Sequence, residues 1–181
     1  MKTRTPATLE DLMRVPGKAE LVNGEIVHMA PTGAKPGRAG DEIYFSLRLH
    51  EQIAGDGRAV SDNKAFRVNL PHRQTLSPDA AYYKGPDPGM AFYPQAPVFA
   101  AEVRSEGDYT PRAERAIAVK RADYFASGTL VVWDVDLLAE DVVHKYSAAD
   151  PEHPVIFRRG EIADAEPAVT GWTMKVDDLF R

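Results

Sequence analysis

The chain has no cysteine among its 181 residues. The absence of thiols excludes disulfide bonds and cysteine-ligated zinc sites, and it is typical of a protein that stays in the cytoplasm. No apolar run approaches the roughly 18 residues that a membrane-spanning helix needs. The N-terminal stretch MKTRTPATLEDL lacks the apolar segment of a signal peptide. We therefore expect a soluble, cytoplasmic protein with no membrane partner.

The chain also lacks an excess of positive charge. Its 22 lysine and arginine residues are outnumbered by 27 aspartate and glutamate residues, which gives a net charge of −5. This charge argues against strong sequence-independent affinity for nucleic acid, because such affinity needs a basic surface. Local basic patches are still compatible with it. One contains Lys64, Arg67, His72 and Arg73, and the other contains Arg112, Arg115 and Arg121. A solvated face is the simpler explanation for each of these residues.

Several catalytic motifs are missing. The sequence contains no G-x-x-x-x-G-K-[ST] phosphate loop, no G-x-G-x-x-G dinucleotide motif, no H-E-x-x-H zinc motif and no G-x-S-x-G nucleophile turn. The five histidines are scattered without ligand spacing, so no zinc site is expected. A glycosidase carboxylate pair stays open on the sequence alone, but it gives no role to Lys120, which is described below.

The composition fits one globular domain. The sequence is 44% hydrophobic and 27% charged, which is ordinary for a soluble protein. A chain of 181 residues is long enough to bury most of its apolar surface. No internal repeat, low-complexity tract or domain boundary interrupts it. We therefore expect a single domain over residues 1–181.

Residues 97–136 predict a βαβ unit, the crossover that builds parallel sheets. A buried strand is followed by a short polar loop, an amphipathic helix and a second buried strand. Period-2 alternation in the first strand places Glu102 and Arg104 on one face, and Phe99 and Val103 on the other. The helix positions expected off the apolar stripe are Arg112, Arg115, Arg121 and Asp123.

Two charged residues of this unit occupy positions that are expected to be apolar. Glu102 lies inside the first strand, and Lys120 lies near the middle of the apolar stripe of the helix. The other members of the stripe are Ala113, Ala116, Ile117 and Tyr124. A lysine that faces a core is costly unless it finds a counter-charge. We expect Glu102 and Lys120 to meet, either as a structural ion pair or as part of a site; a lysine that reaches solvent is the third possibility.

Local patterns predict the other elements. Thr8 caps a short helix over residues 8–15, and Asn23-Gly24 turns a hairpin. Residues 31–40 read as a mobile loop, and residues 41–54 as a helix on which His50 is packed rather than a ligand. Strands are expected at 58–61, 65–70 and 75–83, followed by a long loop over 84–96, antiparallel strands over 141–147 and 154–165, and a short turn or helix over 174–180.

Glu20 and Asp79 join Glu102 and Lys120 as residues that an ordinary core does not explain. Glu20 lies on the first strand of the hairpin. Asp79 follows Pro78 in a small, apolar run, where a turn residue is the alternative explanation. Carboxylate oxygens suit hard divalent cations such as Mg²⁺. A bound cation can activate water, and a neighbouring lysine can orient that water or stabilise negative charge.

The order and spacing of these residues resemble the PD-(D/E)XK signature of restriction-endonuclease-like nucleases. Pro78-Asp79 is followed, after 22 residues, by Glu102-Val103-Arg104. In that superfamily the aspartate and glutamate hold magnesium or manganese. A lysine normally lies two residues after the glutamate, and here Arg104 occupies that position.

The wider pattern is similar to the Uma-two family of restriction endonucleases within that superfamily. The matching segments are ELVNGEIV, SPDAAYY and the stretch from EVRS to WDVD, in which Lys120, Tyr124 and Gly128 keep a four-residue step. The resemblance spans about residues 8–180. Two features depart from the family pattern: no histidine begins the second helix, where the chain reads PGRAGDEI, and Ser105-Glu106-Gly107 replaces Ser-Pro-Ser.

The resemblance implies an α/β fold with a restriction-endonuclease-like αβββαβ core, in which a mixed sheet is flanked by helices. The sequence pattern adds antiparallel strands at the C-terminus. The resemblance further implies that Asp79 and Glu102 hold Mg²⁺ or Mn²⁺, with Glu20 as an additional acidic ligand. It makes Lys120 a lysine moved from strand to helix that activates or positions the attacking water.

The expected function is metal-dependent hydrolysis of phosphodiester bonds in DNA. Arg104 and Arg112 are the expected contacts to substrate, although Arg104 could equally pair with a carboxylate. A homodimer is expected, because duplex-cutting nucleases of this fold often act as dimers and twofold symmetry is common. The alternative is an inactive nuclease-fold module that binds nucleic acid or a protein partner.

Overall fold

The computed structural model describes residues 5–181, and a six-stranded mixed sheet forms its centre. Residues 1–4, part of the stretch without a signal peptide pattern, lie outside the described residues. The strand order is β10-β9-β8-β7-β6-β3, with β7 and β8 parallel and the other neighbours antiparallel. The strands are β3 (Arg58–Ser61), β6 (Ala80–Tyr83), β7 (Phe99–Val103), β8 (Val131–Val135), β9 (Asp141–Ser147) and β10 (Asp150–Arg158).

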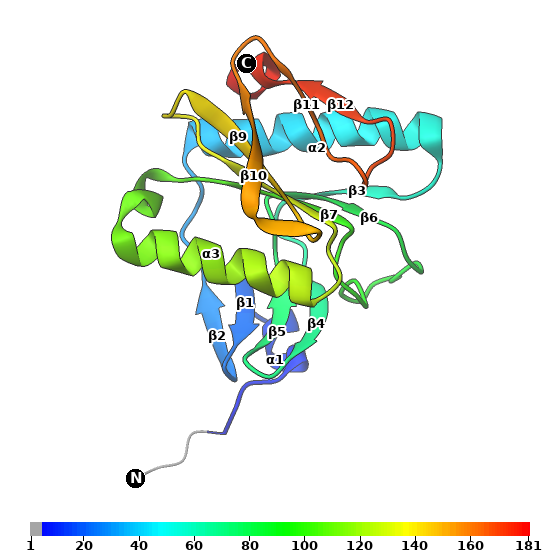
Figure 1. The fold of residues 1–181 in the computed structure, drawn as a ribbon. Helices are drawn as coiled ribbons and strands as arrows, with labels where there is room; N and C mark the ends of the chain where they lie inside the picture. The colour runs from blue at the N-terminus through cyan, green and yellow to red at the C-terminus, as the bar shows by residue number, and fades with distance from the viewer. Residues whose placement is uncertain (1–4) are drawn as a thin grey trace.

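Two long helices cover opposite faces of this main sheet. Figure 1 shows α2 (Ala34–Ala54) above the sheet and α3 (Pro111–Ala126) below it. The chain from β7 through α3 to the parallel strand β8 is the predicted βαβ unit. Phe99 and Val103 pack in the core on the α2 side, whereas Ala100 packs with Tyr124 of α3. The predicted fold class, a mixed sheet between helices, is confirmed.

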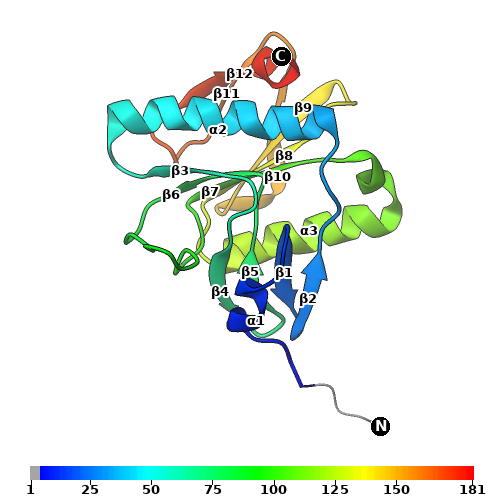
Figure 2. The ribbon, with the colours of Figure 1, turned by 180° about the vertical axis from the view of Figure 1, so that it is seen from behind.

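A second, four-stranded sheet lies beneath α3 and the main sheet (Figure 2). Its strand order is β2-β1-β5-β4. The strands are β1 (Ala19–Val22), β2 (Glu25–His28), β4 (Phe66–Leu70) and β5 (Arg73–Leu76). The predicted hairpin turns at Asn23 and Gly24, whose φ angles of 51° and 71° are those of a type I′ turn. The short helix α1 (Leu9–Met13) precedes it, and Thr8 caps this helix as predicted.

The predicted single strand over residues 75–83 is wrong. The chain leaves the small sheet at the end of β5, crosses at Ser77–Asp79, and enters the main sheet as β6. Pro78 has no amide hydrogen to give to a ladder, and Ser77 donates its amide hydrogen to the Glu20 side chain. The two halves of the apolar run therefore belong to two different sheets.

The predicted mobile loop over residues 31–40 is also wrong for most of its length, because α2 begins at Ala34. Pro36 lies in the first turn of the helix, where no amide hydrogen is needed. Gly40 is buried against Asp79: a Cβ atom at this glycine would lie 3.5 Å from Asp79 Cβ. Tertiary packing thus extends the helix through a segment rich in glycine and proline.

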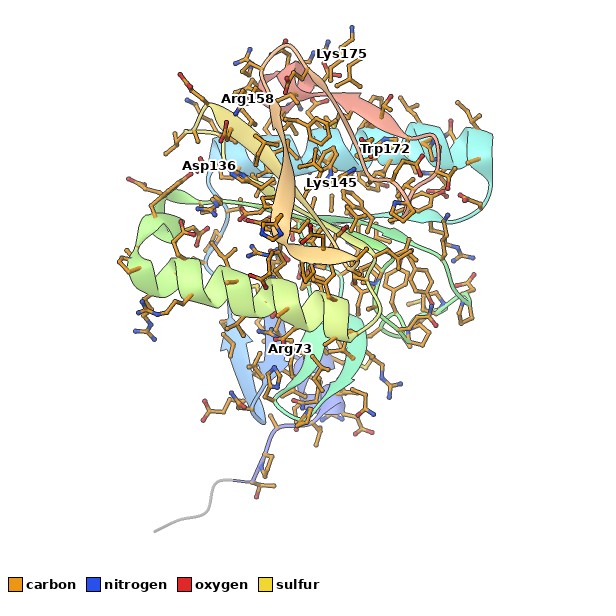
Figure 3. All side chains as sticks on the ribbon, in the orientation of Figure 1. Arg73, Asp136, Lys145, Arg158, Trp172 and Lys175 are labelled. Carbon is orange, nitrogen blue, oxygen red and sulfur yellow. The ribbon has the colours of Figure 1, made fainter. Side chains whose placement is uncertain are left out.

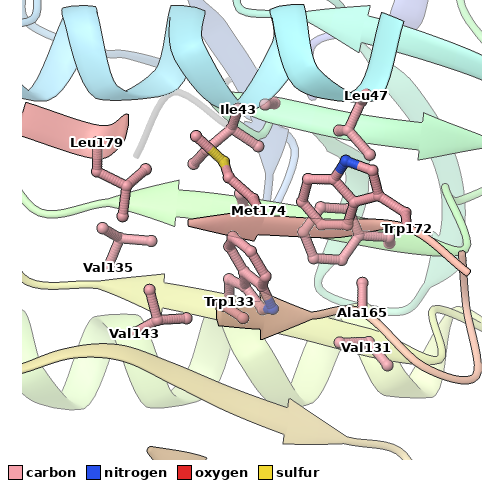
Figure 4. Packing of buried hydrophobic residues seen from close by; sticks show 14 of the residues in the cluster. Ile43, Leu47, Val131, Trp133, Val135, Val143, Ala165, Trp172, Met174 and Leu179 are labelled. Carbon is pink, nitrogen blue, oxygen red and sulfur yellow. The ribbon is translucent and has the colours of Figure 1, made fainter. Parts of the chain in front are cut away.

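The core between α2 and the main sheet contains a group of aromatic side chains among aliphatic ones (Figure 4). The ring centroids of Trp133 and Trp172 lie 5.0 Å apart, and that of Phe99 lies 5.3 Å from Trp133. Trp172 also donates a hydrogen bond of 3.0 Å to Ser46 Oγ on α2. His50 packs edge-on against Tyr82, as expected for a packed histidine.

The C-terminal segment closes this core beside α2. β9 and β10 form the predicted antiparallel pair. Residues 161–165 do not continue that pair as expected, because β11 (Ile162–Asp164) pairs with β12 (Thr173–Lys175) in a separate two-stranded sheet. The 3₁₀ turn η2 (Val176–Phe180) then ends the chain. Among the described residues, no helix combines the length and apolarity needed to span a membrane.

Candidate active site

Glu102 of β7 and Lys120 of α3 form an ion pair across the strand–helix interface. Lys120 Nζ lies 2.8 Å from Glu102 Oε1, and the two side chains are 18% and 24% exposed. The same ammonium lies 3.0 Å from Glu20 Oε1. The predicted meeting of Glu102 and Lys120 is confirmed, and the ammonium is held between two carboxylates.

Tyr124 contacts the same oxygen of Glu102 as Lys120 does. Its hydroxyl donates a hydrogen bond of 2.5 Å to Glu102 Oε1, and its ring is fully buried. Tyr124 follows Lys120 by four residues, so both side chains lie on the same face of α3. The sequence placed Tyr124 in the apolar stripe and assigned it no part in the site. The four-residue step from Lys120 to Tyr124 was the signal that could have revealed it.

Asp79 lies beside Glu102 because it ends the crossing between the two sheets. Its backbone amide donates to Ala101 O at 3.0 Å, and its Oδ2 accepts a hydrogen bond of 2.8 Å from the Val103 amide of β7. Its carboxylate therefore contacts the neighbouring strand, which argues against a purely local turn role. Asp79 Oδ1 lies 2.6 Å from Nζ of Lys18, a residue that the sequence gave no reason to select.

Glu20 of β1 is buried behind Lys120, and only 2% of it is exposed. Its Oε1 accepts a hydrogen bond of 2.8 Å from the Ser77 amide as well as contacting Lys120. Its Oε2 accepts a hydrogen bond from Arg73, which Figure 3 labels between α3 and the small sheet. Both oxygens of Glu20 are thus engaged by groups of the protein.

Asp79, Glu102 and Lys120 line an open cleft of about 520 Å³. Its charged and polar lining includes Lys18, Asp79, Glu102, Arg104, Lys120 and Asp134. Glu20 does not line it. Over residues 5–181, no three His, Cys, Asp or Glu side chains converge as a ready metal cluster. Asp79 and Glu102 nevertheless present hard oxygen donors to one cleft, and these donors fit a divalent cation that takes two carboxylates and completes its shell with water or substrate oxygens.

The carboxylates and lysines of the cleft shift each other's protonation. Burial raises the pKa of Glu102 above its ordinary value and Asp79 adds to the shift, whereas Lys120 opposes it. Burial alone would lower the pKa of Lys120, but Glu102 and Glu20 raise it above its ordinary value. Lys120 is therefore a charged hydrogen-bond donor near neutral pH.

Arg104 occupies the sequence position of the lysine in the PD-(D/E)XK signature, but it is paired with the carboxylates of Asp134 and Glu114. Its Nε and Nη2 donate to the two oxygens of Asp134 at 2.7 and 2.8 Å, and its Nη1 donates to Glu114 at 2.5 Å. The structure thus has the carboxylate pairing that the sequence left open. Arg112 lies exposed in the first turn of α3.

The interpretation of Arg121 as part of a solvated face is wrong, and Asp123, which was expected off the apolar stripe, is also buried. Asp123 is 4% exposed, and its carboxylate accepts from Arg73 Nε at 2.7 Å and lies 2.7 Å from His72 Nε2. The Arg121 guanidinium lies 3.7 Å from the centroid of the Tyr146 ring. A simple stripe underestimates the buried face of α3, because strands of both sheets approach this helix.

The fold thus brings two carboxylates and a lysine together at one cleft. The sequence matches the family Uma2, described as "Putative restriction endonuclease", over residues 9–177. The chain therefore belongs to the Uma2 family. This is the Uma-two family that its sequence motifs resemble. Membership of this family supports a nuclease function, an enzyme that acts on nucleic acid.

A solved structure shares the fold. The crystal structure of "a putative nuclease belonging to DUF820" from Anabaena variabilis superposes with a TM-score of 0.72 at 16% sequence identity. The similarity covers 97% of this chain and 98% of that chain. No curated protein matches the sequence. At this identity the likeness establishes the fold.

Proposed function

We propose that the protein is a metal-dependent endonuclease that hydrolyses phosphodiester bonds of DNA by direct attack of water. The carrying observation is the Lys120–Glu102 pair of 2.8 Å, which lies with Asp79 in an open cleft. An ordinary structural ion pair needs no second carboxylate and no access to solvent. Membership of the Uma2 family supports the same function.

Asp79 and Glu102 would hold Mg²⁺ or Mn²⁺. When bound, such a cation increases the acidity of water and stabilises negative charge on phosphoryl oxygens. The protein positions both carboxylates in advance: the Val103 amide orients Asp79, and the Tyr124 hydroxyl orients Glu102. This arrangement reduces the reorganisation that ligand binding would otherwise require.

Lys120 would orient the attacking water or stabilise the charge that develops on the phosphate. Its raised pKa favours a donor role over that of a general base. Glu20 would position Lys120 from behind, because its contacts are to the lysine and to the protein rather than to the cleft. As the water oxygen bonds to phosphorus, the bond to the leaving oxygen breaks; the attacking water releases a proton to solvent and the leaving oxygen takes one up from solvent, so that no residue becomes covalently attached.

The two arginines expected to contact substrate have different surroundings and are given different roles. We assign phosphate contact to Arg112, which is exposed at the start of α3, and a structural role to Arg104, which is bound by Asp134 and Glu114. Cleavage of both strands of a duplex needs two sites of opposite orientation, which favours a homodimer.

The test is the nicking of supercoiled plasmid DNA with Mg²⁺ or Mn²⁺. We expect cleavage by the wild type and its loss in Glu102→Gln and Lys120→Met. Lys145→Met is the matched control: Lys145 also forms an ion pair of low exposure, at 2.8 Å from Asp164, outside the cleft. Circular dichroism confirms that each variant is folded. The proposal is contradicted if the folded wild type cleaves neither duplex DNA, single-stranded DNA nor RNA. It is also contradicted if all variants cleave as well as the wild type.

One observation favours the second candidate, a nuclease-fold module that binds nucleic acid or a protein without cutting. Lys18, Lys120 and Tyr124 already occupy oxygens of Asp79 and Glu102. The two candidates differ in their response to cations. Stabilisation of the wild type by Mn²⁺ in a thermal melt, abolished by Asp79→Asn, supports the nuclease; DNA binding without this stabilisation supports the module.

A further inference from the structure

Lys18 bridges two carboxylates at the edge of the cleft. Its Nζ lies 2.6 Å from Asp79 Oδ1 and 2.7 Å from Asp62 Oδ1, and its side chain is 13% exposed. Asp62 follows β3 and is more exposed than Asp79. The Asn63 amide donates to the same Asp62 oxygen at 2.7 Å, which holds that carboxylate in place.

This contact conflicts with a cation at Asp79. The ammonium of Lys18 already occupies Oδ1, while Oδ2 accepts from the Val103 amide. A divalent cation and an ammonium at one oxygen would also repel each other. Lys18 must therefore leave Asp79 before the cation can take its place. A partly buried lysine without a partner is costly, so its destination matters.

The second ligand repeats the arrangement. Lys120 contacts Glu102, and it also contacts Glu20, which lies outside the cleft lining. Each carboxylate of the site thus carries a lysine, and each lysine has a second carboxylate behind it. Lys18 can therefore leave Asp79 and keep a counter-charge, whereas Lys120 stays beside Glu102.

We propose that Lys18 is the internal counter-ion of Asp79 and that, when a divalent cation binds, it gives up Asp79 and transfers fully to Asp62, which it already contacts. The inference rests on the proposed function, since it takes Asp79 and Glu102 to be the cation site. Lys18 is then a positioning residue that competes with the cation for Asp79. Asp62 keeps the displaced ammonium paired, which lowers the free-energy cost of the displacement.

Isothermal titration of the full chain with Mn²⁺ tests the transfer without any measurement of cleavage. We expect Lys18→Met to lower the Kd for Mn²⁺ about tenfold, because the competitor is gone, which corresponds to about 1.4 kcal/mol. Asp62→Asn should raise the Kd severalfold, because Lys18 then stays on Asp79. In the double variant Lys18→Met/Asp62→Asn the effect of Asp62→Asn should vanish.

Lys64→Met is the matched control for a general loss of positive charge. Lys64 Nζ donates to the Asp62 backbone carbonyl at 3.0 Å rather than to Asp79, and we expect the variant to bind Mn²⁺ with unchanged Kd. Lys18→Gln repeats the measurement with a polar side chain, in case the methionine variant does not fold.

The outcomes separate the two proposals. Equal Kd values for wild type and Lys18→Met overturn the role of Lys18 and leave the proposed function intact. An Asp62→Asn effect that persists in the Lys18→Met background shows a simple field effect and overturns the transfer. Binding by Lys18→Met alone supports the inference. Absence of binding in both proteins contradicts the proposed function, and the role of Lys18 falls with it.

Discussion

Glu20 and Glu102 contact the same ammonium from two different sheets. Glu20 belongs to β1 of the small sheet and Glu102 to β7 of the main sheet, and Lys120 Nζ lies 3.0 and 2.8 Å from their Oε1 atoms. The lysine on the inner face of α3 therefore joins the two sheets at the cleft. The geometry gives Glu20 a place behind the lysine, whereas the sequence had made it a cation ligand.

A double-mutant cycle distinguishes these two roles of Glu20. Glu20→Gln should weaken Mn²⁺ binding in the wild-type background, because Lys120 is then held by Glu102 alone. In the Lys120→Met background the same substitution should have no effect, since Glu20 acts through the lysine. Calorimetric Kd values for the four proteins measure the coupling. A loss of affinity of similar size in both backgrounds would make Glu20 a direct ligand.

Binding of Mn²⁺ should depend on pH through Glu102. Burial and Asp79 raise the pKa of Glu102 above its ordinary value of 4.5, and a cation needs the deprotonated carboxylate. The affinity should therefore fall as the pH falls through this raised pKa, and it should level off above it. Titrations across a pH series check the midpoint. Glu102→Gln should bind more weakly and should lose this pH dependence, while retention of the midpoint in that variant would assign it to another group.

Tyr124→Phe should move the same midpoint to higher pH. The variant removes a 2.5 Å hydrogen bond to ionised Glu102, and loss of a donor to the charged form raises a carboxyl pKa. The free energy of unfolding should fall by roughly 2 kcal/mol, as for other hydrogen bonds to charged groups. Urea denaturation and the pH series measure the two effects.

Tyr83→Phe is the control for Tyr124→Phe. Tyr83 is also buried, but its hydroxyl donates to Pro86 O at 3.1 Å, away from the cleft. We expect a loss of about 1 kcal/mol of stability and an unchanged midpoint. Equal shifts of the midpoint in both variants would refute a specific action of Tyr124 on Glu102.

The two arginines should separate stability from DNA affinity. Arg104→Met should lower the free energy of unfolding by roughly 3 kcal/mol, because it removes the close ion pair of buried Asp134 and leaves it the more distant Arg121, at 3.8 Å. Arg112→Ala should change stability by less than about 0.5 kcal/mol and should reduce the slope of log affinity for DNA against log salt by about 1. Urea denaturation and salt-dependent binding of a DNA duplex provide the measurements. If Arg104→Met also reduced the slope of log affinity against log salt, Arg104 would be assigned a phosphate contact.

Local periodicity was sufficient for the βαβ unit and for its ion pair. Alternation along the strand set the face of Glu102, and helical spacing set the face of Lys120, so their meeting followed from two short patterns. The hairpin at Asn23-Gly24 was predictable for the same reason, because its turn type follows from two adjacent residues.

Features that depend on packing between distant segments were not predictable. The run over residues 75–83 looks like one strand, and only the position of the second sheet determines that it divides at Ser77–Asp79. Asp123 lies off the apolar stripe, yet Arg73 of β5 reaches it. Lys18 precedes the hairpin in a turn without any pattern, and its role depends on the position of Asp79, 61 residues further along the chain.

Because the chain crosses between the sheets at Ser77–Asp79, the geometry of the cleft depends on how the small sheet packs against the main sheet. Glu20 moves with the small sheet and Glu102 with the main sheet, so slight separation of the sheets would disassemble the site before either sheet unfolds. A ligand that contacts residues of both sheets would stabilise their packing against each other. Amide hydrogens of β1 and β5, the strands that carry Glu20 and Arg73, would then exchange more slowly with solvent when the cleft is occupied.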